Sequence, residues 1–154
     1  MITYQVERWS DLINEFKPLF EKHWLEVDNE REAIPLDVDW EGYARIDLAN
    51  MLCVVTCRDS DSEEKLIGYC ITIISYPLHY RTTLHAVVDV YYVSPEYRKS
   101  GVGLNLFTFT EGVYKQMGVK NIVTSTKSYL NHSKLFEAMG YTNNEIGFFK
   151  LLCQ

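Results

Sequence analysis

Residues 98–103 place two basic side chains and two glycines directly after an apolar run that ends near Val93. The segment reads Arg-Lys-Ser-Gly-Val-Gly and leads into a helical pattern. The start of a helix offers unpaired backbone N–H groups and a partial positive charge, which together suit a phosphate. Gly101 and Gly103 let the backbone approach an anion without a Cβ in the way. The pattern therefore predicts a phosphate-binding turn.

Two other nucleotide-binding turns do not fit this segment. A dinucleotide fold requires a third glycine where the chain has Leu106, and an acidic residue about 20 residues further on, near Val123. A P-loop requires Gly-Lys-Ser/Thr at its end, whereas Gly103 is followed by Leu104 and Asn105. A glycine pair alone is a weak signal, because most such pairs are simple turns.

Asp89 is the only charged residue in the apolar run that precedes the turn. Strict alternation along a strand places it on the same face as Tyr91 and Val93. A lone carboxylate in a central strand is a candidate proton acceptor. A structural Asp, hydrogen-bonded to the backbone, is the other interpretation.

The apolar pattern predicts the elements that position these residues. The first helix is expected to start with Ser10 as its N-cap and to be kinked or divided near Lys17 by Pro18. Strands are predicted at 2–6, 51–57, 66–76, 84–93, 121–126 and 148–152, and helices at 12–27, 40–48, 103–117 and 131–139. The order β, α, α, β, β, β, α, β, α, β is typical of a mixed α+β sheet.

Composition indicates one ordinary globular domain. The chain has 154 residues, of which 47% are hydrophobic and 23% charged, so residues 1–154 are expected to form a single domain. No stretch approaches the roughly 20 apolar residues of a membrane span. The first twelve residues lack the basic and apolar regions of a signal peptide, and a cytoplasmic location is expected.

The cysteines and histidines predict neither disulfides nor a metal site. Cys53, Cys57, Cys70 and Cys153 form no C-x-x-C pair, and three of them lie in apolar runs, so buried reduced thiols are expected. The four histidines show no ligand spacing with one another or with the cysteines.

Charge is divided unevenly along the chain. Residues 1–64 contain 6 Lys and Arg against 16 Asp and Glu, a net charge of −10, and residues 65–154 contain 9 against 5, a net charge of +4. The acidic first part argues against nucleic acid, which requires clustered positive charge. It suits a cationic acceptor, and the basic second part suits a polyanionic ligand. A solvated acidic surface is the alternative.

Residues 98–103 match the acetyl-CoA signature of the GNAT N-acetyltransferase superfamily, Arg/Gln-x-x-Gly-x-Gly/Ala, without mismatch. Residues 92–97 resemble the family's approach to this turn, and residues 135–141 resemble the end of its following helix. The element order resembles the GNAT fold, a mostly antiparallel sheet that is splayed at its fourth strand and flanked by helices. The first third shows a looser likeness to small acetyltransferase-like proteins of tailed phages.

The resemblance implies direct transfer of an acetyl group from acetyl-CoA to a primary amine. Backbone groups of Tyr91 and Val93 are then expected to hold the pantetheine arm, and an N–H near Val93 to polarise the thioester carbonyl. The amides of residues 99–104 are expected to bind the pyrophosphate, and Asn131 to lie near the sulfur. The other expected cofactor contacts are Tyr92, Arg98, Lys99, Ser100, Gly101, Val102, Gly103, Leu104 and Phe136.

The resemblance gives Asp89 the role of base but offers no obvious acid. Phe136 stands where many family members have Tyr, and Phe cannot donate a proton. Tyr141 is the expected substitute, with Tyr129 as an alternative. A mechanism without an acid, in which the thiolate takes its proton from water or the ammonium, also stays open.

Two functions of other classes stay open. The missing Tyr favours a non-catalytic GNAT-fold protein that binds acyl-CoA or a protein partner, and a module for a different phosphorylated ligand is the third interpretation. For an enzyme, the acceptor could be a polyamine, an antibiotic, an amino acid or a protein lysine. We expect no nucleic-acid or membrane partner, and a homodimer is possible. Further candidates for the acceptor pocket are Glu21, His23, Trp24, Glu26, Trp40 and Tyr43.

Overall fold

The structure is a computed structural model that describes residues 1–29 and 32–152. The strands are β1 (Ile2–Val6), β2 (Leu52–Asp59), β3 (Lys65–Ser75), β4 (His85–Val93) and β5 (Asn121–Val123). The helices are α1 (Trp9–Val27), α2 (Trp40–Leu48), α3 (Val102–Met117) and α4 (Ser133–Ala138), with short 3-10 helices η1 (Ser60–Ser62) and η2 (Pro95–Ser100). The order of the elements confirms the prediction up to α4.

The five strands form one sheet in the order β1-β2-β3-β4-β5. Neighbouring strands from β1 to β4 are antiparallel, whereas β5 runs parallel to β4. β5 pairs with β4 through three residue pairs, the last between Val87 and Val123. The mixed α+β class is therefore confirmed, and β4 continues beyond Val87 without pairing to β5.

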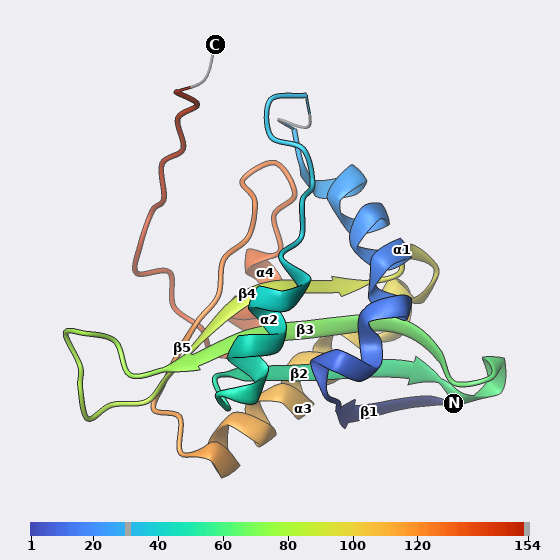
Figure 1. Cartoon of the computed structure of the whole chain (residues 1–154), viewed down its shortest axis with the longest axis horizontal. Coiled ribbons are helices and arrows are strands. Elements are labelled where there is room, and N and C mark those ends of the chain that lie inside the picture. The colour runs from blue at the N-terminus through green and yellow to red at the C-terminus, as the bar shows by residue number, and fades with distance from the viewer. Residues whose placement is uncertain (30–31, 153–154) are drawn as a thin grey trace.

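Helices cover both faces of the sheet (Figure 1). α1 and α2 pack on one face, where the rings of Phe16 and Phe20 of α1 each lie 5.2 Å from that of Tyr69 of the sheet. α3 and α4 pack on the other face. β2 is buried on both faces along its whole length, and its first four residues, Leu52 to Val55, are therefore all apolar rather than alternating.

α1 is one continuous helix through Pro18, so the predicted division near Lys17 is wrong. Packing of the apolar face on the sheet outweighs the backbone hydrogen bond that a proline removes. The helix begins at Trp9 without a side-chain cap, so Ser10 is not its N-cap. Trp9 fixes this start, since its indole N–H donates to the Trp40 carbonyl at 3.0 Å.

Residues 142–152 form no strand, so the predicted strand at 148–152 is wrong. Ile146, Phe148 and Leu152 are 77%, 96% and 84% exposed. The segment, dark red in Figure 1, leaves the sheet after α4. Apolar composition alone does not form a strand, because a strand needs a partner edge and a surface on which to pack.

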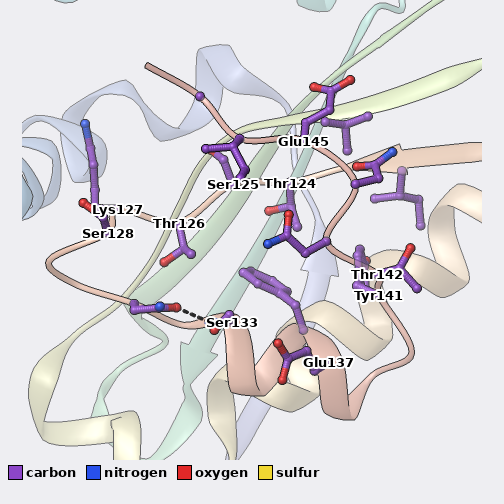
Figure 2. Close-up of a pocket in the computed structure, with 18 of the residues that line it drawn as sticks. Thr124, Ser125, Thr126, Lys127, Ser128, Ser133, Glu137, Tyr141, Thr142 and Glu145 are labelled. Carbon is purple, nitrogen blue, oxygen red and sulfur yellow. Dashed lines mark hydrogen bonds between the residues drawn. The ribbon is translucent and has the colours of Figure 1, made fainter. Parts of the chain in front are cut away.

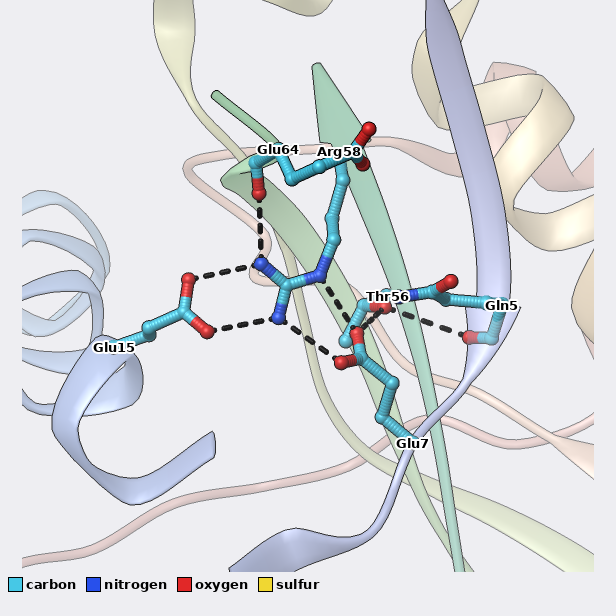
Figure 3. A network of polar contacts seen from close by, with 6 residues as sticks. All are labelled: Gln5, Glu7, Glu15, Thr56, Arg58 and Glu64. Carbon is cyan, nitrogen blue, oxygen red and sulfur yellow. Dashed lines mark hydrogen bonds and ion pairs between the residues drawn. The ribbon is translucent and has the colours of Figure 1, made fainter. Parts of the chain in front are cut away.

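An arginine network joins the β1–β2 edge of the sheet to α1 (Figure 3). The guanidinium of Arg58 donates five hydrogen bonds of 2.8–3.0 Å, to the carboxylates of Glu7 and Glu15 and to the carbonyl of Glu64. The Arg58 side chain is 10% exposed. All five N–H donors of the guanidinium are used, so this buried charge is fully paired.

Three of the cysteines are buried free thiols, as predicted: Cys53, Cys57 and Cys70. Burial raises the pKa of Cys53 to about 12, which keeps it protonated near neutral pH. Cys153 lies outside the described residues.

Candidate active site

The predicted phosphate turn connects η2 to α3. Gly101 has a φ of 77°, a left-handed conformation that favours glycine. A Cβ added at Gly101 or Gly103 would meet nothing within 4 Å, so both positions border open space. The first helical bond of α3 runs from the Asn105 N–H to the Gly101 carbonyl at 3.0 Å, which leaves the amides of residues 102–104 without partners inside the helix. The turn can therefore hold an anion through its backbone.

The side chains of the turn divide between solvent and core. Lys99 and Leu104 are exposed, whereas Val102 is 2% exposed and belongs to the core, so Val102 can reach a ligand through its backbone alone. The Ser100 hydroxyl donates to the Tyr97 carbonyl at 2.9 Å.

The end of β4 directs backbone groups into the space beyond β5. The Ser94 N–H donates to the Ile67 carbonyl at 2.8 Å, which makes Val93 part of a non-hydrogen-bonded pair with β3. By alternation the same holds for Tyr91. The N–H and C=O groups of Tyr91 and Val93 therefore point away from β3, along the part of β4 that extends past its pairing with β5 at Val87.

The tyrosine side chains of this strand end lie on different faces. The Tyr91 hydroxyl donates to the Ser125 carbonyl at 3.1 Å and lies 3.2 Å from His132 Nδ1, on the α3–α4 side. Tyr92 is 5% exposed on the α1 side, with its ring 4.9 Å from that of His23. Tyr91 is thus the tyrosine of this pair whose side chain reaches the segment after β5.

A β-bulge in β4 lies at Asp89. Ile71 of β3 is opposite Val90, and its neighbour Thr72 is opposite Val88, so Asp89 has no partner on β3. Val88 packs in the α3–α4 core, whereas Val90 packs against the α1–α2 core. The extra residue shifts the alternation by one position.

Asp89 consequently faces α2, and the prediction that it shares a face with Tyr91 and Val93 is wrong. Its exposed carboxylate accepts a hydrogen bond from the Tyr43 hydroxyl of α2. Burial raises the pKa of Tyr43, and the Asp89 carboxylate raises it further, so Tyr43 stays protonated and can donate.

Tyr141 lies on the opposite face from Asp89, and the structure does not bring these two residues together. Its ring is 5.5 Å from that of Phe136 in the α3–α4 core. Among the described residues, none accepts or donates a hydrogen bond at the buried Tyr141 hydroxyl. Burial and the nearby Glu111 carboxylate raise its pKa. Phe136 is 6% exposed and also packs against the Tyr91 ring, at 5.7 Å.

Residues 124–131 lie across the open part of the sheet from β4. Asn131 accepts a hydrogen bond from the Ser133 N–H at 2.7 Å, but α4 begins at Ser133 with His132 as its N-cap residue, so the predicted helix start at Asn131 is two residues too early. The Tyr129 hydroxyl donates to the Val27 carbonyl of α1 at 2.6 Å. Tyr129 therefore directs its proton to α1.

Arg98 contacts α1, which no pattern in the sequence indicates. Its Nη1 and Nη2 donate to the two carboxylate oxygens of Glu26 at 2.6 and 2.7 Å, across 72 residues of sequence. Its Nε donates to the Val93 carbonyl at 2.7 Å. Hydrogen bonding to Arg98 lowers the pKa of Glu26, which keeps the pair ionised near neutral pH.

Two cavities lie near these residues. The larger, of about 1130 Å³, is lined by residues of β5, of the segment after it and of the chain end, among them Tyr141 (Figure 2). Asn131 and Phe136 also line it. The smaller, of about 470 Å³, lies between α1 and the segment before α2 and is lined in part by Trp24 and Trp40. The predicted acceptor-side tryptophans therefore do share a cavity.

In residues 1–29 and 32–152, no three His, Cys, Asp or Glu side chains are grouped so that they could hold a metal ion. No helix within these ranges is long and apolar enough to cross a bilayer.

Solved structures with the same fold cover almost the whole chain. An aminoglycoside acetyltransferase from an uncultured soil metagenomic sample, in complex with sisomicin, has a TM-score of 0.73 at 16% identity over 99% of this chain and 97% of that chain. Glucosamine-6-phosphate N-acetyltransferase from Arabidopsis thaliana has a TM-score of 0.72 at 15% identity over 99% of each chain. Ribosomal-protein-alanine N-acetyltransferase from Brucella melitensis biovar Abortus 2308 has a TM-score of 0.73 at 14% identity, over 99% of this chain and 100% of that one.

A search of curated protein sequences found no match. At such low identities the solved structures show the fold alone. The profile of the acetyltransferase (GNAT) family, however, matches residues 9–141, which include the turn, Asp89 and α4. The chain therefore belongs to the acetyltransferase (GNAT) family, whose members transfer acetyl groups to amines.

Proposed function

We propose that this protein transfers the acetyl group of acetyl-CoA directly to a primary amine. One observation carries the proposal: the backbone edge of Tyr91 and Val93, which β5 does not pair, leads into a helix-start turn whose glycines Gly101 and Gly103 border open space. Acetyl-CoA has an amide-containing arm and a diphosphate, and these two features suit a free strand edge and a helix N-terminus in that order.

Each part of this surface has a separate binding task. Tyr91 and Val93 would pair with the pantetheine amides, and the Val93 N–H would stabilise charge that develops on the thioester oxygen. The amides of residues 99–104 would hold the pyrophosphate, with Lys99 adding charge and Gly101 and Gly103 leaving room. Asn131 and Phe136 would line the thioester end.

Bound acetyl-CoA supplies an activated acyl group, with the nitrogen–carbon bond forming as the carbon–sulfur bond breaks. The attacking amine must be neutral and loses one proton, which Asp89 would accept. Tyr43 would hold the Asp89 carboxylate at the bulge through its hydrogen bond. Tyr141 would donate a proton to the thiolate, since its hydroxyl is protonated and lacks a partner among the described residues.

We propose a small cationic amine as the acceptor. The smaller cavity combines the carboxylates of Glu21 and Asp37 with the rings of Trp24 and Trp40, groups that attract an ammonium. The chain's own Lys17 ammonium lies 5.9 Å from the centre of the Trp40 ring. The acceptors named for the similar structures are chemically diverse, so they do not indicate which amine this protein acetylates. A protein lysine stays the alternative. A cytoplasmic location, a homodimer and the phage-like character of the first third stay predictions.

The test is release of the free thiol from acetyl-CoA in the presence of polyamines, aminoglycosides, amino acids and lysine peptides. We expect release that requires both acetyl-CoA and an amine. Binding of acetyl-CoA without release for any amine would favour a non-catalytic acyl-CoA-binding protein, and absence of binding would contradict the proposal.

Asp89→Asn tests the proposed base. Because Asn cannot accept the proton, we expect kcat/KM to fall by roughly 10²-fold, while the affinity for acetyl-CoA is unchanged. Asp11→Asn, which removes a carboxylate at the far end of α1, is the control in the same thiol-release assay. An Asp89→Asn enzyme with full activity would make Asp89 structural.

A further inference from the structure

Arg98 and Glu26 join the pyrophosphate turn to the last turn of α1. The guanidinium and the carboxylate form a bidentate pair, at 2.6 and 2.7 Å, in which both groups are planar and matched. The third donor of the arginine, Nε, is fixed on the Val93 carbonyl at 2.7 Å. The guanidinium also lies 5.5 Å from the centre of the Tyr92 ring. Four contacts thus set the direction of this one side chain.

The same turn of α1 is tied to the opposite wall of the open sheet. Val27 follows Glu26 in sequence, and its carbonyl accepts the hydrogen bond of Tyr129 at 2.6 Å. Arg98 follows β4, whereas Tyr129 follows β5, and these strands pair no further than Val87. The last turn of α1 therefore spans the place where the two strands part.

These contacts argue against a direct contact between Arg98 and a diphosphate. To bind phosphate with its guanidinium, Arg98 would have to give up the Glu26 carboxylate, which already neutralises its charge. The turn does not need this exchange, because the amides of residues 102–104 and the exposed Lys99 face an anion without it.

We propose that Arg98 is a positioning residue that couples cofactor binding to α1, the helix on the acceptor side. This inference rests on the proposed function. A diphosphate that orders the turn also orders Arg98, and through Glu26 it fixes the last turn of α1, whose Trp24 lines the acceptor cavity. By linkage, an acceptor that holds α1 in place strengthens cofactor binding by the same factor.

The direction in which Glu26→Gln changes the affinity for coenzyme A distinguishes a positioning role of Arg98 from direct contact with phosphate. With coenzyme A as the probe in isothermal titration calorimetry, we expect Glu26→Gln and Arg98→Met each to weaken binding by roughly 3–10-fold, with the double variant close to Arg98→Met alone. If Arg98 bound phosphate directly, Glu26→Gln would strengthen binding, because it frees the guanidinium and removes a negative charge. Asp11→Asn removes one negative charge from the first turn of α1 without touching Arg98 or the acceptor cavity, and it is the control.

Amide hydrogen exchange, measured with the protein saturated, reports which segments the ligand orders and does not depend on a simple loss of affinity. At saturating coenzyme A, amides of residues 21–29 and 100–108 of the wild type should both gain protection. In Arg98→Met the gain should persist at 100–108 and be lost at 21–29. Arg98→Lys keeps the charge but lacks the planar fork, and it should behave like Arg98→Met.

The outcomes distinguish the two proposals. A wild type that does not bind coenzyme A would overturn the proposed function and this inference together. Binding without protection of residues 21–29, equal protection in Arg98→Met, or tighter binding by Glu26→Gln would overturn the coupling role alone and leave the proposed function standing.

Discussion

The β1–β2 edge of the sheet and the β4–β5 end differ in how completely their polar groups are paired. At the first, Arg58 uses all five of its N–H donors on two carboxylates and a carbonyl. At the second, β4 extends past β5, and among the described residues the buried side-chain atoms without a partner are the hydroxyls of Thr124 and Tyr141. Both residues line the larger cavity.

This difference indicates that the β1–β2 edge serves stability, whereas the β4–β5 end serves binding. An unpaired buried polar group costs about 1–3 kcal/mol, so folding alone favours the fully paired arrangement of the first edge. Groups left without partners can pair with a ligand instead. Substitutions at the paired edge should therefore change the free energy of unfolding, and substitutions at the open end should change binding.

Arg58→Met should show the largest effect on stability. It leaves Glu7 and Glu15 without their partner, and we expect the free energy of unfolding to fall by about 3 kcal/mol, near the lower limit for broken buried pairs because Glu15 is partly exposed. Urea denaturation measures this change, and acetyl-CoA affinity of the folded protein should be unchanged. Arg45→Met, at an exposed pair, is the control and should cost no more than about 0.5 kcal/mol. A folded Arg58→Met protein that cannot bind acetyl-CoA would contradict the assignment of this edge to stability rather than to binding.

His23, a residue of α1 whose ring lies beside that of Tyr92, should give an intermediate effect that depends on pH. Burial lowers its pKa to about 4, from an ordinary 6.5, and its Nδ1 lies 3.0 Å from the Tyr69 hydroxyl. The unfolded chain therefore binds the proton more readily, and stability should fall as the pH drops from 6.5 towards 4, by up to about 1.4 kcal/mol per pH unit.

Denaturation at pH 6.5, 5.5 and 4.5 measures this slope. His23→Phe keeps a ring beside Tyr92 and should remove most of the slope in this window. The lowered pKa values of Glu7 and Glu26 place their own loss of stability below pH 4.5. An equal slope in His23→Phe would assign the effect to other groups.

The smallest expected effect is that of salt on the KM for the acceptor amine. If the acidic first part of the chain attracts a cationic amine, the KM for that amine should rise a few-fold between low and 0.3 M salt, because the charges are screened over a distance of about 8 Å at physiological salt. The KM for acetyl-CoA, held mainly by backbone groups, should change less. Preference for neutral or acidic amines without salt dependence would rule out this attraction.

Local features of the structure followed from the sequence. The turn at residues 98–103 and most strand bounds could be predicted, because glycine conformation and apolar periodicity depend on neighbouring residues. The face of Asp89 could not, since a bulge adds one residue to β4 and reverses the alternation. The pair of Arg98 with Glu26 joins positions 72 residues apart, and neither residue type indicates its partner.

At the chain end, the local sequence pattern predicts a strand that the folded chain does not form. Residues 148–152 have the composition of a strand, but a strand also requires an edge to pair with. Ser10 likewise has the side chain of an N-cap, yet burial of Trp9 starts the helix before it. In each case a contact made by the folded chain overrides a local preference.

Gly103→Asp tests acetyl-CoA binding at the turn most directly. An acidic residue in the first turn of a helix interacts favourably with the helix dipole, so the variant should melt no lower than the wild type without ligand. The added carboxylate would repel the diphosphate, and the rise in Tm that acetyl-CoA gives the wild type should be lost, whereas Gly103→Ala should keep most of it. An undiminished rise in Tm for a correctly folded Gly103→Asp would contradict binding of the cofactor at this turn.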